Sequence, residues 1–329
     1  MKKKILVTGG AGFIGFNFVN KLLELGYEIH NIDVLRYSAN KKEIFKIKNS
    51  KHFFYKINVN NKDIYNILKK NKILEIIHFA AETHVDNSIG SPKFFFKNNC
   101  LDFIDFVENI SKYYNELSNI RKKKFKFIYI STDEIYGSLK LKEKSFNESS
   151  PLKPKNPYSS SKASAELYLS SYANTFNFPY IITNCSNNFG KFQNEEKFIP
   201  TIFKNALKGK KIPIYGDGKN IRDWIYVDDH INAILLLLKK GKINNKYNIG
   251  SNQEFKNIEL ANIICDILDD HIPKKISYKN QIVFIKDRLG HDFRYSIDNK
   301  KIKKIGWKPQ ISLRDGLLKI ADFYIKKFK

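Results

Sequence analysis

Residues 4–33 read KILVTGGAGFIGFNFVNKLLELGYEIHNID, and their order of apolar and glycine residues decides the fold. The β-branched and apolar run 4–8 predicts a strand, and a glycine-rich turn follows it. Residues 27–32 predict a second strand, which ends at Asp33. The helix expected between the strands ends before Gly26, and its buried face is predicted to hold Ile14, Phe18, Leu22 and Leu25.

The glycine-rich turn has the spacing of a dinucleotide-binding site. Gly9, Gly12 and Gly15 stand between a strand and a helix, and Asp33 follows about 20 residues later. Glycines let the backbone approach a pyrophosphate, and the helix N-terminus offers N–H donors and the positive end of its dipole. The Asp33 carboxylate can accept hydrogen bonds from an adenosine ribose, which favours NAD, whereas Arg36 leaves NADP open.

The alternation of strands and helices continues through the first half of the chain. We expect further strands at residues 53–57, 75–79, 125–130 and 180–184, and helices at 62–70 and 94–107. This order predicts an α/β fold, a Rossmann-type doubly wound parallel sheet with a smaller C-terminal substrate-binding domain. We place the dinucleotide-binding domain at 1–185 and the second domain mainly at 186–329, with some segments returning to the first.

The charge of the chain invites comparison with nucleic-acid-binding proteins. The formal net charge is +25, but only six of the 58 basic residues are arginine, and the lysines are scattered along the chain. A dedicated nucleic-acid surface clusters its basic residues and uses more arginine. We therefore expect a solvated lysine-rich surface, no nucleic-acid partner, and a field that favours an anionic substrate.

Other features bear on compartment and redox state. No apolar run reaches the roughly 20 residues of a membrane helix, so no membrane partner is expected. The apolar part of MKKKILV stops at glycines after three residues, which fits a first strand rather than a signal peptide. Cys100, Cys185 and Cys265 are odd in number and widely spaced, which indicates reduced thiols and no metal site. We expect a cytoplasmic protein.

Two stretches in the middle of the chain carry groups suited to proton transfer. Ser131-Thr-Asp-Glu134 follows the predicted strand 125–130, at the edge where parallel sheets bind ligands. Tyr158 and Lys162 share one face of a helix that begins at Pro157. A nearby ammonium lowers the pKa of a phenol from about 10, which makes Tyr158 a candidate base. The spacing alone is weak, since it also occurs at Tyr37, Tyr65, Tyr136 and Tyr215.

Half of the six arginines lie in two late stretches. Arg222 begins RDWIYVD (222–228), and Arg288 and Arg294 lie in DRLGHDFRY (287–295). The forked guanidinium group suits a phosphate, so these residues favour a pyrophosphate-bearing substrate beside the smaller domain. Surface salt bridges are the other interpretation that they allow.

Together these motifs resemble the extended short-chain dehydrogenase/reductase superfamily, through Gly9-x-x-Gly12-x-x-Gly15, Asp33 and Tyr158-x-x-x-Lys162. More narrowly, nearly the whole chain resembles the dTDP-glucose 4,6-dehydratase family. The stretches that carry the narrower resemblance are AAETHVD (80–86), STDE (131–134), NCSNNFG (184–190), EKFIP (196–200), RDW (222–224) and GHDFRY (290–295).

The resemblance implies a lyase that dehydrates dTDP-glucose to the 4-keto-6-deoxy sugar by internal hydride transfer through tightly bound NAD. It implies that Tyr158, with Lys162 beside it, takes the O4 proton while C4 gives hydride to NAD. It further implies that Thr132 binds the O4 region, Glu134 removes the C5 hydrogen, and Asp133 protonates the departing C6 hydroxyl. Adjacent carboxyls in different environments can carry these opposite protonation states. Their alternative role is to cap a helix or turn.

The resemblance also implies binding residues and a partner. Those implied for the cofactor are Gly9, Gly12, Phe13, Ile14, Gly15, Asp33, Asn58, Val59, Phe79, Ala80, Ala81, Thr83, Tyr158, Lys162 and Asn188. Those implied for the nucleotide sugar are Thr83, Thr132, Asn187, Lys197, Phe198, Pro213, Tyr215, Arg222, Asn257, Asp287, Arg288 and His291. Members of the family are typically homodimers, which pair the helix at 94–107 with the helix after Tyr158.

The sequence departs from the family pattern at several positions, namely Asn58, Asp102, Lys191 and Leu289. Two other interpretations stay open. One is another NAD-dependent nucleotide-sugar enzyme, such as a UDP-sugar 4-epimerase, a decarboxylase or a 4,6-dehydratase of a different nucleotide sugar. The other is a catalytically silent nucleotide-binding or basic interaction protein. An epimerase needs no acid–base pair beside Thr132, and a silent protein should have lost a catalytic residue, yet none is missing.

Overall fold

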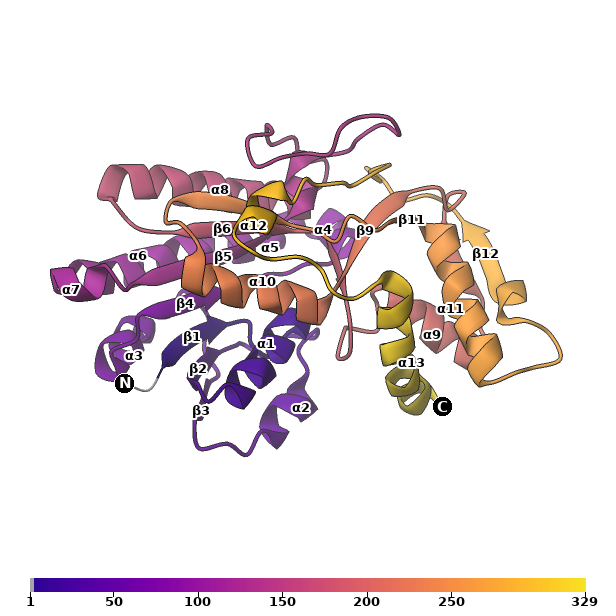
Figure 1. The fold of residues 1–329 in the computed structure, drawn as a ribbon, viewed down its shortest axis with the longest axis horizontal. Coiled ribbons are helices and arrows are strands. Elements are labelled where there is room, and N and C mark those ends of the chain that lie inside the picture. Colours follow the sequence, from indigo (N-terminus) through magenta and orange to yellow (C-terminus); the bar gives the residue numbers. More distant parts are fainter. Residues whose placement is uncertain (1–2) are drawn as a thin grey trace.

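The computed structural model describes residues 3–329. Two units follow one another along the long axis of the molecule: a large unit with a sheet between helices, and a smaller unit in which the chain ends (Figure 1). No helix within the described residues is both long and apolar enough to cross a bilayer.

Seven parallel strands form the sheet of the large unit, in the order β3-β2-β1-β4-β5-β6-β10. Successive strands are added on one side of β1 as far as β3, and on its other side from β4 onward, so the order reverses beside β1. Ligands of open parallel sheets bind at such a reversal, outside the carboxyl ends of the strands. The strands span Lys4–Thr8 (β1), Glu28–Ile32 (β2), His52–Tyr55 (β3), Glu75–His78 (β4), Lys126–Thr132 (β5), Ile181–Cys185 (β6) and Asn245–Ile249 (β10).

Both faces of this sheet are buried by helices. On β1, Ile5 and Val7 pack with α1, α10 and α12, whereas Leu6 between them packs with α3, α6 and α8. Burial on both faces explains why the strands are continuous apolar runs, and the predicted doubly wound parallel sheet is confirmed. These helices span Phe13–Glu24 (α1), Val227–Lys240 (α10), Lys300–Lys304 (α12), Asp63–Asn71 (α3), Asp102–Asn115 (α6) and Pro157–Phe176 (α8).

Two details of the helices differ from the sequence prediction. Leu25 was expected on the buried face of α1, but it follows the last helical residue and is 52% exposed. The helix expected at 94–107 is longer and is interrupted by a π-helical turn at Lys97–Leu101, between α5 (Pro92–Phe96) and α6. Helix α8 begins as predicted at Pro157, where the Asn156 side chain accepts a hydrogen bond from the Ser159 backbone N–H.

The smaller unit has its own hydrophobic core, in which Phe203, Leu260 and Tyr324 are buried. It holds a three-stranded sheet, β11-β9-β7, and a parallel pair, β12-β8. Its elements are β7 (Asn187–Phe189), α9 (Phe198–Leu207), β8 (Ile212–Tyr215), β9 (Ile221–Tyr226), β11 (Glu254–Lys256), α11 (Asn257–His271), η3 (Tyr278–Gln281), β12 (Ile282–Ile285) and α13 (Leu313–Phe328). The chain crosses between the units more than once, since α10, β10 and α12 belong to the large one.

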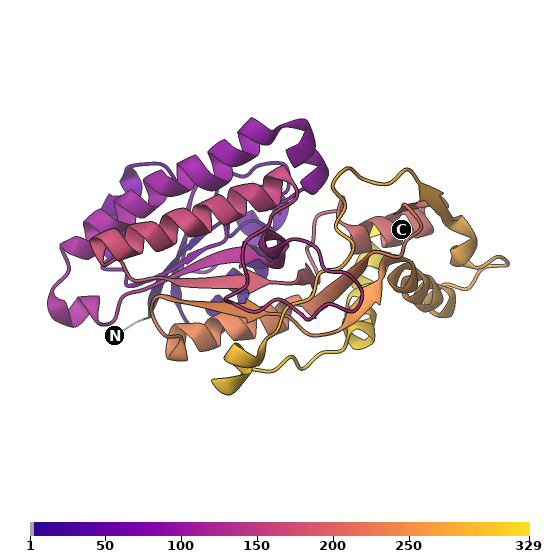
Figure 2. The same ribbon diagram turned by 90° about the horizontal axis from the view of Figure 1, so that it is seen from above.

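Short helices connect the remaining strands of the large unit. They are α2 (Lys41–Lys46), α4 (Val85–Gly90), α7 (Asn119–Lys122) and the 3₁₀ turn η2 (Asp133–Tyr136). In Figure 2 the helices that run from α4 to α7 and the helix α8 lie side by side along one face of the sheet.

Candidate functional site

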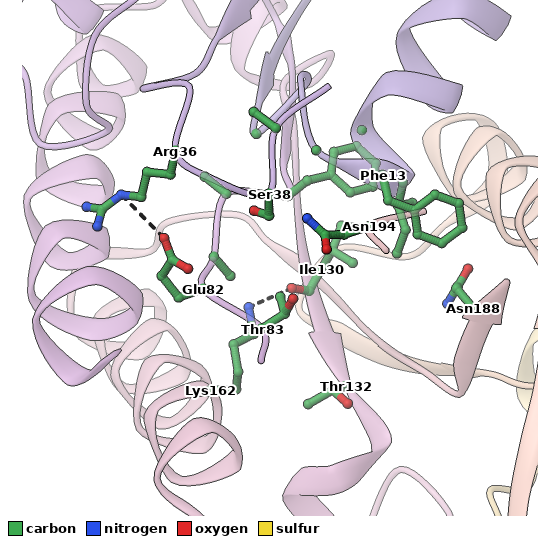
Figure 3. Close-up of a pocket in the computed structure, with 18 of the residues that line it drawn as sticks. Phe13, Arg36, Ser38, Glu82, Thr83, Ile130, Thr132, Lys162, Asn188 and Asn194 are labelled. Carbon is green, nitrogen blue, oxygen red and sulfur yellow. Dashed lines mark hydrogen bonds and ion pairs between the residues drawn. The ribbon is translucent and has the colours of Figure 1, made fainter. Parts of the chain in front are cut away.

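A cavity of about 280 Å³ opens where β1, β4, β5 and β6 end, and it extends to β7 of the smaller unit. All of the residues implied for the cofactor line it: Gly9, Gly12, Phe13, Ile14, Gly15, Asp33, Asn58, Val59, Phe79, Ala80, Ala81, Thr83, Tyr158, Lys162 and Asn188. In Figure 3, Thr132, Lys162 and Asn188 approach the cavity from three different elements.

The glycine-rich turn brings backbone to the cavity wall at the N-terminus of α1. Gly9 has a φ of +71°, and a Cβ there would lie 2.6 Å from the backbone nitrogen of Ala80, so only glycine fits. At Gly12, which lines the cavity, a Cβ would meet only the Gly9 carbonyl oxygen, at 3.3 Å. The turn therefore forms a backbone cradle at a helix N-terminus, which fits the pyrophosphate of a dinucleotide.

Asp33 is held at the end of β2 by the backbone. Its Oδ2 accepts a hydrogen bond from Ala11 N at 3.0 Å, and its Oδ1 accepts one from Leu35 N at 2.7 Å. Burial raises the pKa of this carboxyl, while these two donors and Arg36 act to lower it. Each carboxylate oxygen can accept a second hydrogen bond, so the group can still bind a ribose hydroxyl.

Arg36 is paired with a different carboxylate, Glu82. Its Nε lies 3.4 Å from an Oε1 of Glu82, as the dashed line in Figure 3 shows, and its guanidinium carbon lies 4.6 Å from the centre of the Phe94 ring. Glu82 is 5% exposed. The Arg36 guanidinium could otherwise bind a 2′-phosphate, but here it is already paired with Glu82.

Thr132, Asp133 and Glu134 lie at the end of β5 and in the turn η2. The Glu134 backbone N–H donates to Thr132 Oγ1 at 3.3 Å, and Thr132 Oγ1 donates to Asp133 Oδ1 at 3.4 Å. Asp133 is 2% exposed, and its Oδ2 has no hydrogen-bond partner among residues 3–329. Thr132 thus caps the turn, while the two carboxyls face the cavity.

The two carboxyls have different electrostatic surroundings. Burial raises the pKa of Asp133 well above its ordinary value, and the charges of Glu134 and Asp223 raise it further. Burial also raises the pKa of Glu134, but Arg222, Lys197 and the Asn156 side chain oppose the shift. Asp133 is therefore the better proton donor of the pair, and Glu134 the better proton acceptor.

Tyr158 and Lys162 are buried on the first turns of α8. Lys162 Nζ donates to the Ile130 carbonyl at 2.8 Å and lies 4.2 Å from the centre of the Tyr129 ring. Burial lowers the pKa of Lys162 to about 7. The sequence predicted a lowered pKa for Tyr158, but burial and the nearby carboxyl Glu134 raise it well above 10, and the Thr132 hydroxyl only partly opposes this. Additional positive charge is needed to make this phenol a base at neutral pH.

Asn188 is fixed on β7 by contacts at both ends of its amide. Its Nδ2 donates to the Ser186 carbonyl at 2.9 Å, and its Oδ1 lies 2.8 Å from Nδ1 of His230 on α10. The oxygen can only accept, so Nδ1 of His230 carries the proton. His230 is fully buried, and burial lowers its pKa to about 3, so the ring is neutral.

The residues implied for the nucleotide sugar fall into two groups. Thr83, Thr132, Asn187 and Lys197 line the cavity, and Lys197 Nζ donates to the Thr83 carbonyl at 2.9 Å. The others lie outside the cavity lining: Phe198, Pro213, Tyr215, Arg222, Asn257, Asp287, Arg288 and His291. Of these, Phe198 stacks on Trp224, and Asn257 begins α11 with its N–H donating to the Asn220 carbonyl.

Four members of this outer group form a cluster near Asp86 of α4, which we name the Arg288 cluster: Tyr215, Asp287, Arg288 and His291. Arg288 Nε lies 2.7 Å from Asp86 Oδ1, and the Tyr215 hydroxyl donates to Asp86 Oδ2 at 3.3 Å. His291 Nδ1 lies 2.6 Å from Asp287 Oδ1. Arg222 is separate and buried, with its guanidinium 4.2 Å from the Tyr295 ring centre and bonded to the Asp292 carbonyl.

Several residues of the cavity wall were not identified from the sequence, namely Ser38, Glu82, Asn98, Gln193 and Asn194. Glu82 lies within residues 80–86 and Asn194 shortly before residues 196–200, two stretches noted in the sequence. A single polar residue in a loop does not by itself indicate a binding role. Cys185 also lines the cavity; its thiol donates to the Ser131 carbonyl, and burial raises its pKa to about 12. It is a buried thiol rather than a nucleophile.

Comparison with known proteins adds the following findings. A family model described as GDP-mannose 4,6 dehydratase matches residues 6–320. The chain is 40% identical over 329 residues to dTDP-glucose 4,6-dehydratase of Haemophilus influenzae, an alignment that covers 98% of this chain and 97% of the relative.

Solved structures of nucleotide-sugar enzymes have a similar fold. The chain superposes with a TM-score of 0.89 and 34% identity on dTDP-glucose 4,6-dehydratase of Streptomyces venezuelae with NAD bound, covering 98% and 97% of the two chains. UDP-glucose 4-epimerase of Thermotoga maritima with UDP-glucose gives a TM-score of 0.86 at 28% identity, covering 99% and 100%.

Proposed function

Because this chain belongs to the dTDP-glucose 4,6-dehydratase family, we propose that it removes water from dTDP-glucose to form dTDP-4-keto-6-deoxyglucose, with NAD as its resident cofactor. One observation carries the proposal beyond a general nucleotide-sugar fold. The carboxyls Asp133 and Glu134 line the same cavity as Tyr158 and Lys162, and burial raises the pKa of Asp133 well above its ordinary value, which suits an acid beside a base.

Oxidation at C4 is the part that Tyr158 and Lys162 serve. When bound, NAD accepts a hydride from C4 of the sugar and later returns it to C6, and its nicotinamide ring is cationic in the oxidised form. Tyr158 takes the proton of the O4 hydroxyl, and Thr132 binds that oxygen. The buried phenol needs positive charge to act as a base. Lys162, four residues later on the same helix, supplies part of that charge when it is protonated.

Elimination of water is the part that the carboxyls serve. The ketone at C4 acidifies the C5–H bond, and Glu134 takes that proton. Asp133, whose pKa burial raises, gives its proton to the C6 hydroxyl, so that water leaves and a C5–C6 double bond forms. The hydride that returns to C6 is then matched by a proton taken up at C5. A 4-epimerase performs no elimination and needs no such pair, so this pair favours dehydration over epimerisation.

The substrate side of the site is proposed from charge. Lys197 and Asn187 line the cavity, and Arg222 and the Arg288 cluster lie in the smaller unit beyond it. Guanidinium groups bind the oxygens of a diphosphate well. We assign NAD binding to residues 1–185 and nucleotide-sugar binding mainly to residues 186–329.

Assembly and location complete the proposal. Exposed apolar side chains lie on α5, the π-helical turn and α8: Phe94 (42%), Phe96 (41%), Leu101 (50%) and Leu167 (61%). Such side chains on adjacent helices favour a homodimer that pairs these helices. The three cysteines are free thiols, which suits the reducing cytoplasm.

The fate of the sugar hydrogens tests this function. Substrate labelled with deuterium at C4 should give product labelled at C6, and product formed in heavy water should carry deuterium at C5. Glu134→Gln keeps the shape of the side chain but not its basicity, so hydride transfer from C4 should persist while little 4-keto-6-deoxy product forms. Return of the label to C4 would indicate an epimerase, and full elimination by Glu134→Gln would remove the role of Glu134.

A further inference from the structure

A buried carboxylate outside the reaction centre lies behind one wall of the cavity. Asp102, the first residue of α6, is 3% exposed and accepts hydrogen bonds from three side chains. Its Oδ1 accepts from Lys97 Nζ at 2.8 Å and from Asn60 Nδ2 at 3.1 Å, whereas its Oδ2 accepts from Asn58 Nδ2 at 3.0 Å. Of the three donors, only Asn58 lines the cavity.

These contacts determine which way the Asn58 amide faces. A carboxylate only accepts hydrogen bonds, so Asp102 requires the nitrogen end of the amide. At the other end, Asn58 Oδ1 accepts from the Val59 backbone N–H at 2.7 Å. Two separate contacts therefore demand the same orientation. The carbonyl oxygen keeps a second lone pair, and it is the group that Asn58 offers to a hydrogen-bond donor in the cavity.

The place of Asn58 in the sheet indicates which part of a dinucleotide it meets. A bound dinucleotide would place its pyrophosphate at the turn after β1 and its ribose at Asp33 after β2. Asn58 follows β3, the next strand, so the base on that ribose would reach it. Ile57 and Val59 flank it on the cavity wall and provide apolar contacts for a ring. Adenine carries an exocyclic amine, a donor that an amide oxygen accepts.

We propose that Asp102 is a positioning residue for recognition of the cofactor base. Through Asn58 it presents a hydrogen-bond acceptor to the adenine amine, and so selects adenine over a base with a carbonyl oxygen at that position. This inference rests on the proposed binding of NAD. It also accounts for two departures from the family pattern, Asn58 and Asp102, as one linked pair.

The test compares two cofactors that differ only at this position: NAD and nicotinamide hypoxanthine dinucleotide, in which an oxygen replaces the amine. Their dissociation constants are measured by calorimetry on the full chain freed of cofactor. The wild type should prefer NAD by about tenfold or more. With the hypoxanthine cofactor, the Asn58 oxygen would face the oxygen of the base, and neither can donate a hydrogen bond to the other.

Asp102→Asn is the decisive variant because it changes no side-chain volume. Its oxygen stays with Lys97 and Asn60, so its new NH₂ group faces Asn58 and requires the oxygen end of that amide. Turning the Asn58 amide costs its bond from the Val59 N–H, so the variant holds both orientations, and the turned one offers a donor that suits hypoxanthine. The preference for NAD should therefore fall about tenfold, with affinity for the hypoxanthine cofactor unchanged or improved.

Matched variants separate this effect from general ones. Asp105→Asn makes the same change at an exposed position of α6 and should leave the preference intact. In an Asn58→Ala background, Asp102→Asn should no longer change the preference, because Asp102 acts through Asn58. An unchanged preference in Asp102→Asn, an equal loss in Asp105→Asn, or equal binding of the two cofactors by the wild type would overturn the inference. Failure of the wild type to bind NAD at all would instead remove the proposed function.

Discussion

Asp133 and Glu134 are adjacent in the chain, yet the structure gives them different chemical characters. Asp133 Oδ2 has no donor among residues 3–329, and Arg222 and the Thr132 hydroxyl only partly oppose the effect of burial on the pKa of this carboxyl. Glu134 lies near Arg222 and Lys197, which oppose the effect of burial on its pKa. The difference comes from residues far apart in sequence, which fold around one strand end. A sequence motif can identify the two carboxyls, but their surroundings in the fold determine which one acts as acid and which as base.

Replacing Tyr158 with Phe tests the proposed base. The change removes one hydroxyl from a buried ring, so the fold should persist while kcat falls by roughly 10²–10⁴, the usual contribution of one general acid–base group. Circular dichroism checks the fold, and turnover is followed by product formation. Tyr65→Phe is the matched control, since Tyr65 belongs to an exposed Tyr-x-x-x-Lys pair bonded to Glu116 and should leave turnover unchanged. Near wild-type turnover in Tyr158→Phe would mean that another group is the base.

Cofactor choice is predicted from Asp33 and the ion pair beside it. A 2′-phosphate would meet the carboxylate of Asp33, so NAD(H) should bind roughly tenfold to a hundredfold more tightly than NADP(H). Glu82→Gln removes the negative charge that pairs with Arg36. The dissociation constants of NAD(H) and NADP(H) should then become more similar. Equal binding of both cofactors by the wild type would contradict the role given to Asp33.

At the scale of single residues, the sequence predicted the site residues whose type is required by local backbone geometry. The glycines of the turn and Asp33 belong to one continuous segment, so their spacing alone placed them at the cavity. Glu82 and His230 were not identified, because their importance comes from a partner elsewhere: Arg36 for one, and Asn188 for the other. The raised pKa of Tyr158 also depends on burial, which the motif does not reveal.

At the scale of elements, packing of α10 against β7 places a titratable ring in the interior. His230 Nε2 has no partner among the described residues, and burial lowers the pKa of the ring to about 3. An unfolded chain binds a proton at this histidine below pH about 6.5, whereas the folded chain does not until about pH 3. The stability that this group contributes is therefore complete above pH 6.5 and is lost as the pH falls from 6.5 towards 3.

This predicts a pH-dependent difference between the wild type and His230→Gln. Between pH 7.5 and pH 5, the free energy of unfolding of the wild type should fall by about 1–2 kcal/mol more than that of the variant, which has no proton to gain. Urea unfolding at both pH values measures it. His271→Gln changes an exposed histidine at the end of α11 and serves as the control. Parallel losses in the wild type and His230→Gln would show that His230 does not titrate on unfolding.

Elements were predicted well where burial on both faces makes an apolar run. The strand expected at 125–130 was found as β5, but it continues to Thr132, because Ser131 and Thr132 pair with Asn184 and Cys185 of β6. Polar residues that end a buried strand have no strand pattern of their own. The π-helical turn after α5 likewise has no signal in the spacing of apolar residues, which continues across it.

At the scale of the whole molecule, the chain does not divide into two consecutive halves. Residues 245–249 form the edge strand β10 beside β6, although the residues on both sides of α10 and β10 belong to the smaller unit. The sequence predicts that some later segments return to the first unit but not which ones, since pairing between distant segments leaves no local pattern. Residues beyond 186 also reach the cavity, because Asn188 on β7 lines it and His230 on α10 is bonded to Asn188.

The surface of α5, the π-helical turn and α8 leads to a prediction about assembly. Leu167 is 61% exposed and Phe96 is 41% exposed, on helices that pack side by side along one face of the molecule (Figure 2). Apolar side chains on neighbouring helices favour a two-fold contact, in which the same patch on each chain meets its copy. The wild type should therefore have the mass of two chains in light scattering after size-exclusion chromatography.

Leu167→Arg and Phe96→Arg should each shift this mass towards one chain, because an isologous contact places two copies of the new charge in one interface. Phe284→Arg is the matched control, since Phe284 is 59% exposed on β12 of the smaller unit and lies outside the proposed contact. It should leave the mass unchanged. A single-chain mass for the wild type would contradict the dimer. A dimer that resists both substitutions but yields to Phe284→Arg would assign the contact to another face. Neither substitution touches the cavity, so a loss of turnover that accompanies dissociation would mean that pairing of α5 and α8 supports the position of Tyr158 at the start of α8.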